Sequence, residues 1–247
     1  MTQFKTRNQL ALAGNALVLS AALVGTTLVN TAWADGHIPA DVKLAEDQTF
    51  TYRLLDEFSS LDPQVVEDVE GSNVVRDLFE GLMSQDAAGN LVPGVATGFS
   101  VNDDNTVYTF TLRENAKWSN GDPITANDFV YAWQRAASPE LASPYQWYIE
   151  LMSLKNASDV VKGEKPKEEL GVKAVDDLTF EVTLSAPLPY FPQMTTHSTT
   201  FPSPQKVIEE HGAEWTKPEN IVSNGAYVLT EHLPNERSVR ELSLIHI

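Results

Sequence analysis

One stretch near the middle of the chain combines the two hydrophobic periods of secondary structure within a short distance. Tyr108, Phe110 and Leu112 alternate with polar residues, which predicts a strand that turns one face toward a core. Phe129 and Trp133 follow at helical spacing and predict an amphipathic helix. A chain with this pattern must pack a helix and a sheet against the same core, so we predict a mixed α/β fold.

The residues between that strand and that helix define a tight turn and a helix start. Asn120 and Gly121 both tolerate a positive φ, which favours a turn, and Pro123 cannot donate a ladder hydrogen bond. Thr125 and Asp128 have the spacing of a capping box, which predicts that the helix begins there. Taken alone, the stretch describes a well-formed α+β core unit and indicates no function.

The segment before this unit is predicted to contain a strand, a short extended piece and a helix. Apolar residues alternate over 48–55, which predicts a strand. Residues 65–69 form an extended candidate, and Ser72 is a plausible N-cap for a helix over 73–83. Glu67 would then lie beside a helix start, where its carboxylate either binds a ligand's positive group or is an ordinary solvated acid.

Similar patterns continue after the central helix. Residues 172–184 repeat the hairpin pattern of 101–112, with an apolar face on the second strand. The five prolines between 187 and 204 argue against a regular helix or a central strand, so we interpret this segment as a crossing between lobes. A short helix is predicted over 204–211 and a strand over 224–230.

The first 34 residues have the organisation of a secretory signal peptide. Lys5 and Arg7 give a short basic start, and the chain from 10 to 29 is uncharged. An A-x-A cleavage site ends at Ala34, so the mature chain is expected to begin at Asp35 and to be periplasmic, without stable membrane insertion. A membrane anchor is the alternative, because the apolar run is nearly long enough to span a bilayer. The chain has no cysteine, and therefore no lipid-attachment cysteine.

The mature chain is strongly acidic. The whole sequence has 17 basic and 34 acidic residues, and two of the basic residues lie in the leader, which leaves 15 basic against 34 acidic residues and a net charge of −19. Such a charge excludes binding of nucleic acid or anionic lipid through a general electrostatic field. The chain has enough apolar and aromatic residues for a sizeable core.

No catalytic or metal-binding motif is found in the sequence. The nucleophile-elbow, zinc-protease, C-x-x-C and phosphate-loop patterns are absent, and the five histidines have no metal-ligand spacing. His197 lies in the proline-rich segment, which favours a structural role. We therefore expect no enzyme, no cofactor and no metal. A secreted hydrolase that uses two unidentified carboxylates is the alternative from a different class.

Four ordered segments carry a resemblance to a known family. They are RDLFEGL at 76–82, WSNGDPITANDFVYAWQR at 118–135, ASPY at 142–145 and NGAY at 224–227. Together they resemble the solute-binding proteins of peptide ABC importers, and among these the oligopeptide-binding members. Four matches in order are far more specific than one short motif.

The resemblance implies a type II periplasmic solute-binding fold, with two lobes that close on a ligand. The first lobe would be discontinuous, formed by 35–79 and 204–237, with a smaller inserted domain over 80–203. The second lobe would lie in a missing half, and residues 238–247 match nothing expected of the family. We interpret the chain as the N-terminal half of such a protein, with an aberrant tail from a truncated or frameshifted reading frame.

The resemblance also implies a function and a set of contacts. The protein would capture oligopeptides in the periplasm and deliver them to an inner-membrane ABC permease, acting as a monomer. Dipeptides, murein peptides and nickel chelates are alternative ligands. Glu67, Asp68 and Val69 match the strand that contacts the peptide backbone, and Tyr145 matches a cleft tyrosine. The acid that binds the peptide's α-amine would lie in the missing half, so the fragment is expected to be binding-incompetent.

Overall fold

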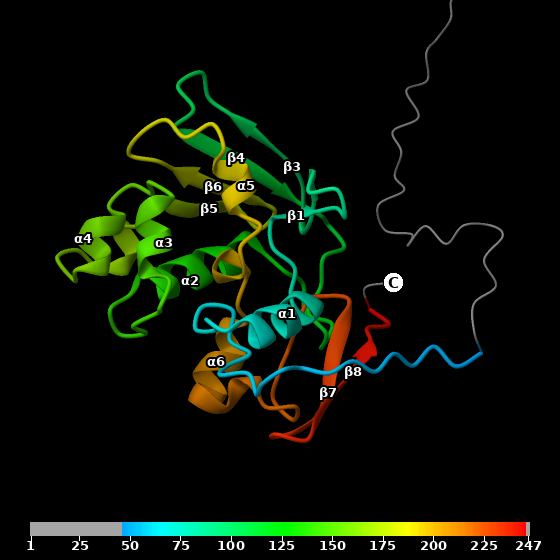
Figure 1. The fold of residues 1–247 in the computed structure, drawn as a ribbon. Coiled ribbons are helices and arrows are strands. Elements are labelled where there is room, and N and C mark those ends of the chain that lie inside the picture. Colours follow the sequence, from blue (N-terminus) through cyan, green and yellow to red (C-terminus); the bar gives the residue numbers. More distant parts are fainter. Residues whose placement is uncertain (1–45, 246–247) are drawn as a thin grey trace, which may run out of the picture. The chain divides into compact units, whose positions relative to one another are not determined.

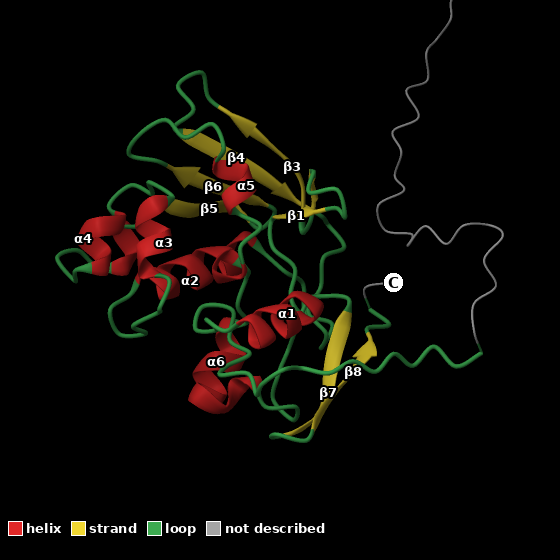
Figure 2. Ribbon diagram, viewed as in Figure 1, coloured by secondary structure: helices red, strands yellow, loops and turns green. Residues whose placement is uncertain are grey.

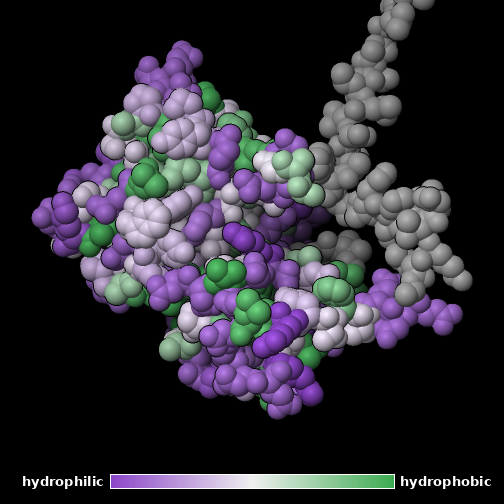
Figure 3. All heavy atoms as spheres, in the orientation of Figure 1, coloured by the Kyte–Doolittle hydropathy of each residue, from purple (hydrophilic) through white to green (hydrophobic). Residues whose placement is uncertain are grey.

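The computed structural model describes residues 46–245 of the chain (Figure 1). The predicted signal peptide lies outside these residues. The face drawn in Figure 3 is mainly hydrophilic, with apolar side chains in small separate groups. Between residues 46 and 245, no helix combines the length and the apolar composition needed to cross a bilayer.

A four-stranded antiparallel sheet is the largest sheet of the described chain (Figure 1, Figure 2). Its strands are β3 (Ala96–Val101), β4 (Val107–Leu112), β5 (Val172–Asp176) and β6 (Thr179–Thr183). Their order is β3-β4-β6-β5, so both predicted hairpins form and they meet along β4 and β6. Phe110 pairs with Phe180 in this register. Directly opposed residues point to the same face, so both rings face the core.

Helix α2 (Ala126–Ala137) packs against β5 and β6 and begins as predicted. The carboxylate of Asp128 accepts the backbone N–H of Thr125 at 2.7 Å, and the capping box is formed. Burial raises the pKa of Asp128 in spite of these hydrogen bonds. Gly121 has a φ of +92° in the turn before the helix. Further helical turns follow at α3 (Gln146–Leu151), α4 (Ala157–Val161) and the 3₁₀ helix Lys167–Glu169.

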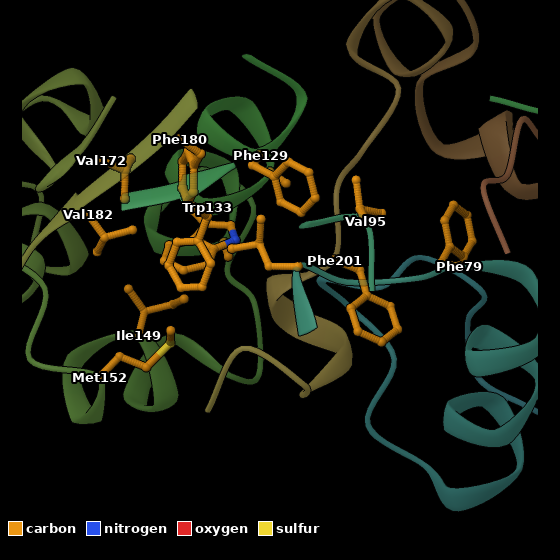
Figure 4. Packing of buried hydrophobic residues seen from close by; sticks show 14 of the residues in the cluster. Phe79, Val95, Phe129, Trp133, Ile149, Met152, Val172, Phe180, Val182 and Phe201 are labelled. Carbon is orange, nitrogen blue, oxygen red and sulfur yellow. The ribbon is translucent and has the colours of Figure 1, made fainter. Parts of the chain in front are cut away.

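Aromatic side chains join α2 to the sheet. Trp133 is fully buried, its ring centroid lies 5.1 Å from that of Phe180, and its Nε1–H donates to the carbonyl of Thr200 at 2.8 Å. Phe191, the first residue of α5 (Phe191–Met194), packs against Tyr108 with centroids 4.9 Å apart. Figure 4 shows Trp133 beside Phe180 within this packing. The proline-rich segment that contains α5 is therefore part of the core.

A second group of elements surrounds α1 (Val69–Leu78). The N–H of Gly225 donates to the carbonyl of Leu78 at 2.7 Å and ties the following hairpin to this helix. A Cβ on Gly225 would lie 2.5 Å from the backbone carbon of Leu78, so only glycine fits there. One hydrophobic cluster runs through both groups. The remaining elements are β1 (Met83–Gln85), β2 (Leu91–Pro93), the 3₁₀ helices Ser198–Thr200 and Gly212–Thr216, α6 (Gln205–His211), β7 (Tyr227–Leu233) and β8 (Arg237–Leu242).

The first described segment differs from the prediction. Residues 48–55 form no strand, and most of their side chains are exposed. Alternation alone does not make a strand, because a ladder also needs a neighbouring edge, and none of the described residues pairs with this segment. Residues 65–69 are extended only in part: the N–H groups of Val65 and Val66 both donate to the carbonyl of Asp62 at 2.9 Å and close a turn, Asp68 has extended φ and ψ angles of −87° and 159°, and Val69 begins α1.

The start of α1 and the effect of one proline were also predicted wrongly. Asp68 is the N-cap instead of Ser72, and its carboxylate accepts the N–H of Gly71 at 2.6 Å. The helix ends at Leu78, several residues earlier than predicted. Pro192 lies in the first turn of α5. The N–H groups of a first turn have no partner within the helix, so proline, which has no N–H, is tolerated there. A proline-rich segment can therefore contain a short helix.

Candidate ligand-binding site

The predicted site lies on a buried polar framework that begins at Asp62. The carboxylate of Asp62 accepts two hydrogen bonds from the guanidinium of Arg135, one of them at 2.8 Å, and another from the Nε1–H of Trp215 at 3.1 Å. The side chains of Asp62 and Arg135 are only 8% and 14% exposed. The carboxylate of Asp62 thus holds together three parts of the chain that are distant in the sequence.

Gln64 extends this framework to the proline-rich segment. Its side chain is fully buried, and its amide nitrogen donates to the carbonyl of Phe201 at 3.0 Å. Its amide oxygen accepts one hydrogen bond from Nη1 of Arg135 at 3.0 Å and another from the hydroxyl of Ser203. The backbone carbonyl of Gln64 accepts the hydroxyl of Ser143 at 2.6 Å. Because a buried amide must keep its partners, these bonds fix the segment around it.

Glu67, Asp68 and Val69 follow this framework directly in the chain and differ in their exposure and hydrogen bonding. Glu67 is exposed, and no hydrogen bond within residues 46–245 uses its backbone N–H or C=O. Asp68 caps α1 and also accepts the N–H of Ser59 at 2.9 Å. Partial burial raises the pKa of its carboxyl, but hydrogen bonds from Ser59 and Gly71 outweigh burial and leave that pKa lowered. Val69 is 70% exposed and is the first residue of the helix.

Ser143 brings Tyr145 to the same region. The hydroxyl of Ser143 donates to the carbonyl of Gln64 and accepts the N–H of Tyr145 at 3.1 Å. Gln64 and Glu67 are three residues apart, which is a span of about 11 Å at most. The two parts of the predicted site are far apart in the sequence, and this hydroxyl links the segment that precedes Glu67 to the backbone of Tyr145.

Tyr145 also belongs to a cluster of four rings, which we call the aromatic platform: Tyr145, Trp147, Tyr148 and His197. The centroid of the His197 ring lies 4.7 Å from that of Tyr145 and 4.5 Å from that of Tyr148. The Trp147 ring lies 5.9 Å from Tyr145 and 5.7 Å from Tyr148. The hydroxyl of Tyr148 donates to the carbonyl of Met194 at 3.0 Å, and burial raises the pKa of Tyr148 to about 12. This ring is therefore fixed and uncharged.

His197 is held in its neutral form. Burial, together with the positive charge of Arg76, lowers the pKa of His197 to about 4. Its Nδ1 accepts the N–H of Thr199 at 3.2 Å, which leaves the proton on Nε2. The proline-rich surroundings predicted only a structural role for His197, and its contact with Tyr145 adds it to the candidate site. No local pattern signals this contact, because the two residues are distant in the chain.

Acidification is expected to destabilise the protein through His197. The imidazole takes up a proton near pH 6.5 in the unfolded chain but only near pH 4 in the folded one, so stability that is present above pH 6.5 is lost as the pH falls toward 4. We expect a loss below about 3 kcal/mol, because solvent screens a partly exposed ring. Urea unfolding of the wild type and of His197→Asn across this pH range measures the effect. Identical pH profiles would contradict it.

Two hollows lie elsewhere on the described chain. The larger, of about 1610 Å³, runs between residues 48–58 and β8. Within it, the guanidinium of Arg240 lies 3.2 Å from the carboxylate of Asp77 and packs over the ring of Tyr52. The smaller, of about 320 Å³, is lined by β5 and β6. None of the four predicted site residues lines either hollow, so the candidate site is separate from both.

A family profile described as "Bacterial extracellular solute-binding proteins, family 5 Middle" matches residues 90–241. The matched region contains the whole four-stranded sheet, α2 and the aromatic platform, and it extends into β8.

Two curated relatives are similar over most of the chain. The periplasmic oligopeptide-binding protein OppA of Salmonella typhimurium is 49% identical over 224 residues, which cover 91% of this chain and 41% of the relative. The periplasmic murein peptide-binding protein MppA of Escherichia coli is 46% identical over 203 residues, which cover 82% of this chain and 37% of the relative. The chain therefore spans about two fifths of the length of the curated relatives it matches.

Solved structures show the same fold. Haemophilus influenzae OppA in complex with the peptide RPPGFSPFR aligns with a TM-score of 0.76 and 46% identity, over 77% of this chain and 37% of that one. The unliganded open form of the murein tripeptide-binding protein MppA aligns with a TM-score of 0.76 and 44% identity, over 78% and 37%. The fold is accordingly that of a type II periplasmic binding protein. The aligned residues cover less than half of each solved chain.

Proposed function

The chain belongs to the bacterial extracellular solute-binding proteins of family 5, and from this premise we propose that it is the solute-binding component of an ABC importer. It captures oligopeptides in the periplasm and delivers them to the membrane permease. The observation that carries the proposal is the backbone of Glu67, whose N–H and C=O make no hydrogen bond within residues 46–245, on a segment that Ser143 ties to the backbone of Tyr145. The printed names of the relatives support peptides as the ligand class.

An importer that accepts many sequences needs to recognise groups that every peptide shares. An extended peptide offers backbone N–H and C=O groups, and it can pair with the unused N–H and C=O of Glu67 as an added strand does. Tyr145 then covers part of the peptide and excludes water from these bonds. Asp68 contributes indirectly, because it caps α1 and fixes the chain direction directly after Glu67. Val69 is exposed on the first turn of that helix and offers apolar surface to the same ligand.

Replacing Glu67 with proline is expected to weaken the binding of all peptides alike. Proline has no N–H, so one backbone hydrogen bond to the ligand is lost whatever the peptide sequence. The loss should be about 1 kcal/mol, which is about a fivefold change in Kd. Calorimetric titration of several short peptides measures it in the protein restored to full length, with and without Glu67→Pro, because this chain alone is expected not to bind.

Glu67→Ala is the matched control, because it removes the carboxylate and keeps the N–H. It should bind peptides as the wild type does. An equal loss in both variants would show that the side chain, rather than the backbone, contacts the ligand. Mass spectrometry of the recovered peptide adds a second check, since cleaved peptide would favour a secreted hydrolase over a binding protein.

Murein peptides are the second candidate ligand, because the MppA relative is nearly as similar to the chain as OppA is. Competition between a murein tripeptide and a trialanine in the same titration separates the two candidates.

We also propose the domain division and location that accompany this function. The first lobe consists of 35–79 and 204–237, and the inserted domain of 80–203. The grouping of β7 and β8 with α1, and the confinement of the four-stranded sheet to 96–183, support this division. The periplasmic names of the relatives support export, and cell fractionation tests it.

A further inference from the structure

The tripeptide Ser-Asn-Gly occurs twice in the chain, at 119–121 and at 223–225. The fold brings the two copies together, because the N–H of Ser119 donates to the carbonyl of Ser223 at 2.7 Å and the N–H of Ser223 donates to Oγ of Ser119 at 3.1 Å. Asparagine is a labile residue, and before glycine it readily loses its side-chain amide, because a glycine without Cβ leaves its backbone nitrogen open to attack the preceding side chain. The same local chemistry thus occurs in two structural settings.

The first copy lies in an exposed turn. Asn120, Gly121 and Asp122 are all exposed, and a Cβ on Gly121 would meet no atom within 4 Å beyond its chain neighbours. The side chain of Asn120 folds back along the chain: its Oδ1 accepts the N–H of Asp122 at 3.0 Å, and its Nδ2 donates to the carboxylate of Asp122 at 2.9 Å. The N–H of Gly121 donates to the carbonyl of Trp118 at 2.8 Å. All these bonds lie within the turn, so water can replace them without opening the core.

The second copy is buried and bound to distant residues. Asn224 is only 3% exposed. Its Oδ1 accepts the N–H of Glu80 at 3.1 Å, and its Nδ2 donates to the carbonyl of Glu80 at 3.0 Å, across 144 residues of sequence. The N–H of Gly225 donates to the carbonyl of Leu78, the last residue of α1. This copy can therefore change its shape only when the segment before β7 separates from the end of α1.

We propose that Asn120 is a site of spontaneous deamidation and that the fold protects Asn224 from the same reaction. The backbone nitrogen of Gly121 loses its proton to hydroxide and attacks Cγ of Asn120. A bond between this nitrogen and Cγ forms, the bond between Cγ and Nδ2 breaks, and the amide group takes up a proton and leaves as ammonia. Water then opens the cyclic imide at either of its two C–N bonds, which gives aspartate or isoaspartate. The N–H of Asp122 favours the attack, because its hydrogen bond to Oδ1 polarises the side-chain carbonyl.

The product changes the turn that contains it. The hydrogen bond from Nδ2 of Asn120 to Asp122 is lost, and in its place two carboxylates of like charge face each other. Isoaspartate also routes the main chain through its Cβ and lengthens the turn. Because Ser119 directly precedes the changed residue, we expect its hydrogen bond to Ser223 to open more often. Deamidation would thus loosen the link between the turn before α2 and the segment before β7.

Timed incubation of the wild-type chain in mildly alkaline buffer, followed by digestion and mass spectrometry, tests the chemical assignment. In the folded chain, Asn120 should convert to the acid at least about a hundredfold faster than Asn224, because Asn224 reacts only after local opening. In urea that unfolds the chain, the two asparagines should convert at similar rates, since their local sequences match. Conversion of Asn120 should slow at neutral pH, because less hydroxide is present to remove the proton from Gly121.

Asn120→Gln is the matched control. Glutamine keeps the amide but would have to close a larger ring, so this position should stay intact during the same incubation. Hydrogen exchange then measures the effect on the link between the two copies. After incubation, the amide of Ser119 should exchange about fivefold faster in the converted wild type than in fresh protein, as expected for one weakened hydrogen bond. In Asn120→Gln its exchange rate should be the same before and after incubation.

The outcomes that would overturn the proposal are distinct. Equal conversion of Asn120 and Asn224 in the folded chain would overturn it, and so would an Asn120 that stays intact while the chain in urea converts. Unchanged exchange at Ser119 after conversion would overturn the expected loosening of its bond to Ser223. None of these measurements uses a bound ligand, so their results do not depend on the proposed function.

Discussion

Replacing Trp133 with alanine is expected to lower the free energy of unfolding by about 3–5 kcal/mol, the range for large buried aromatic residues. The ring is fully buried, with centroids 5.1 Å from Phe180 and 6.2 Å from Phe191. Its removal leaves a cavity between α2, the sheet and the proline-rich segment. It also leaves the carbonyl of Thr200 without its donor. Denaturant unfolding followed by circular dichroism measures the loss.

Trp133→Phe is the matched control for this prediction. It keeps a buried ring but removes the Nε1–H, so the loss should be clearly smaller than for alanine. Val69→Ala provides a surface comparison, because that side chain is 70% exposed and should cost about 0.5 kcal/mol or less. A loss below about 1 kcal/mol for Trp133→Ala would mean that the surrounding core collapses onto the vacated space.

Replacing Arg135 with methionine is expected to have an effect of similar size, about 3–5 kcal/mol, for an electrostatic reason. The variant keeps an apolar stem but leaves the carboxylate of Asp62, only 8% exposed, without its cation. It also removes a donor from the amide oxygen of Gln64. Isolated buried charge is costly, whereas the intact pair is well satisfied by its hydrogen bonds. Urea unfolding at pH 7 measures the change.

Arg237→Met tests whether burial is the cause. Arg237 also pairs with a carboxylate, that of Glu231 at 3.0 Å, but their side chains are 57% and 37% exposed. Its loss should cost far less than the loss of Arg135, because solvent screens an exposed pair. Equal costs at Arg135 and Arg237 would contradict the assignment of the Asp62 pair as a buried structural centre.

The four-stranded sheet and α2 could be predicted from the sequence because their signals are local. The alternation at Tyr108, Phe110 and Leu112 lies within one strand, and Thr125 and Asp128 lie within one helical turn. In such cases the residues that carry the pattern also make the contacts that stabilise the element. The confirmed hairpins and capping box belong to this class.

The start of α1 could not be predicted because two residues satisfy the same local rule. Asp68 and Ser72 are both acceptable N-caps. The choice depends on Ser59, whose backbone N–H bonds to the carboxylate of Asp68 and holds that side chain in the capping position. This contact spans nine residues, and a helix-start pattern does not contain it. Residues 48–55 differ for a related reason, since a strand depends on a partner edge as well as on its own alternation.

The candidate site was predictable only in part, because it is assembled by long-range contacts. The resemblance implies Glu67 and Tyr145, and the segments that contain them are joined by the hydroxyl of Ser143, which donates to the carbonyl of Gln64. His197 joins them through the proline-rich segment, whose path is set by the buried amide of Gln64. Neither hydrogen bond can be predicted from residue spacing or from hydrophobic periodicity.

The β7–β8 hairpin also affects how the chain behaves when it is concentrated. In the described part of the chain β8 has a ladder partner on one side only, and an open strand edge can recruit identical strands from other molecules into aggregates. Arg237 and Glu241 lie exposed on this strand, and another copy would have to strip water from these charges before it could align. The same six residues therefore complete a hairpin and discourage copies of the protein from adhering to one another.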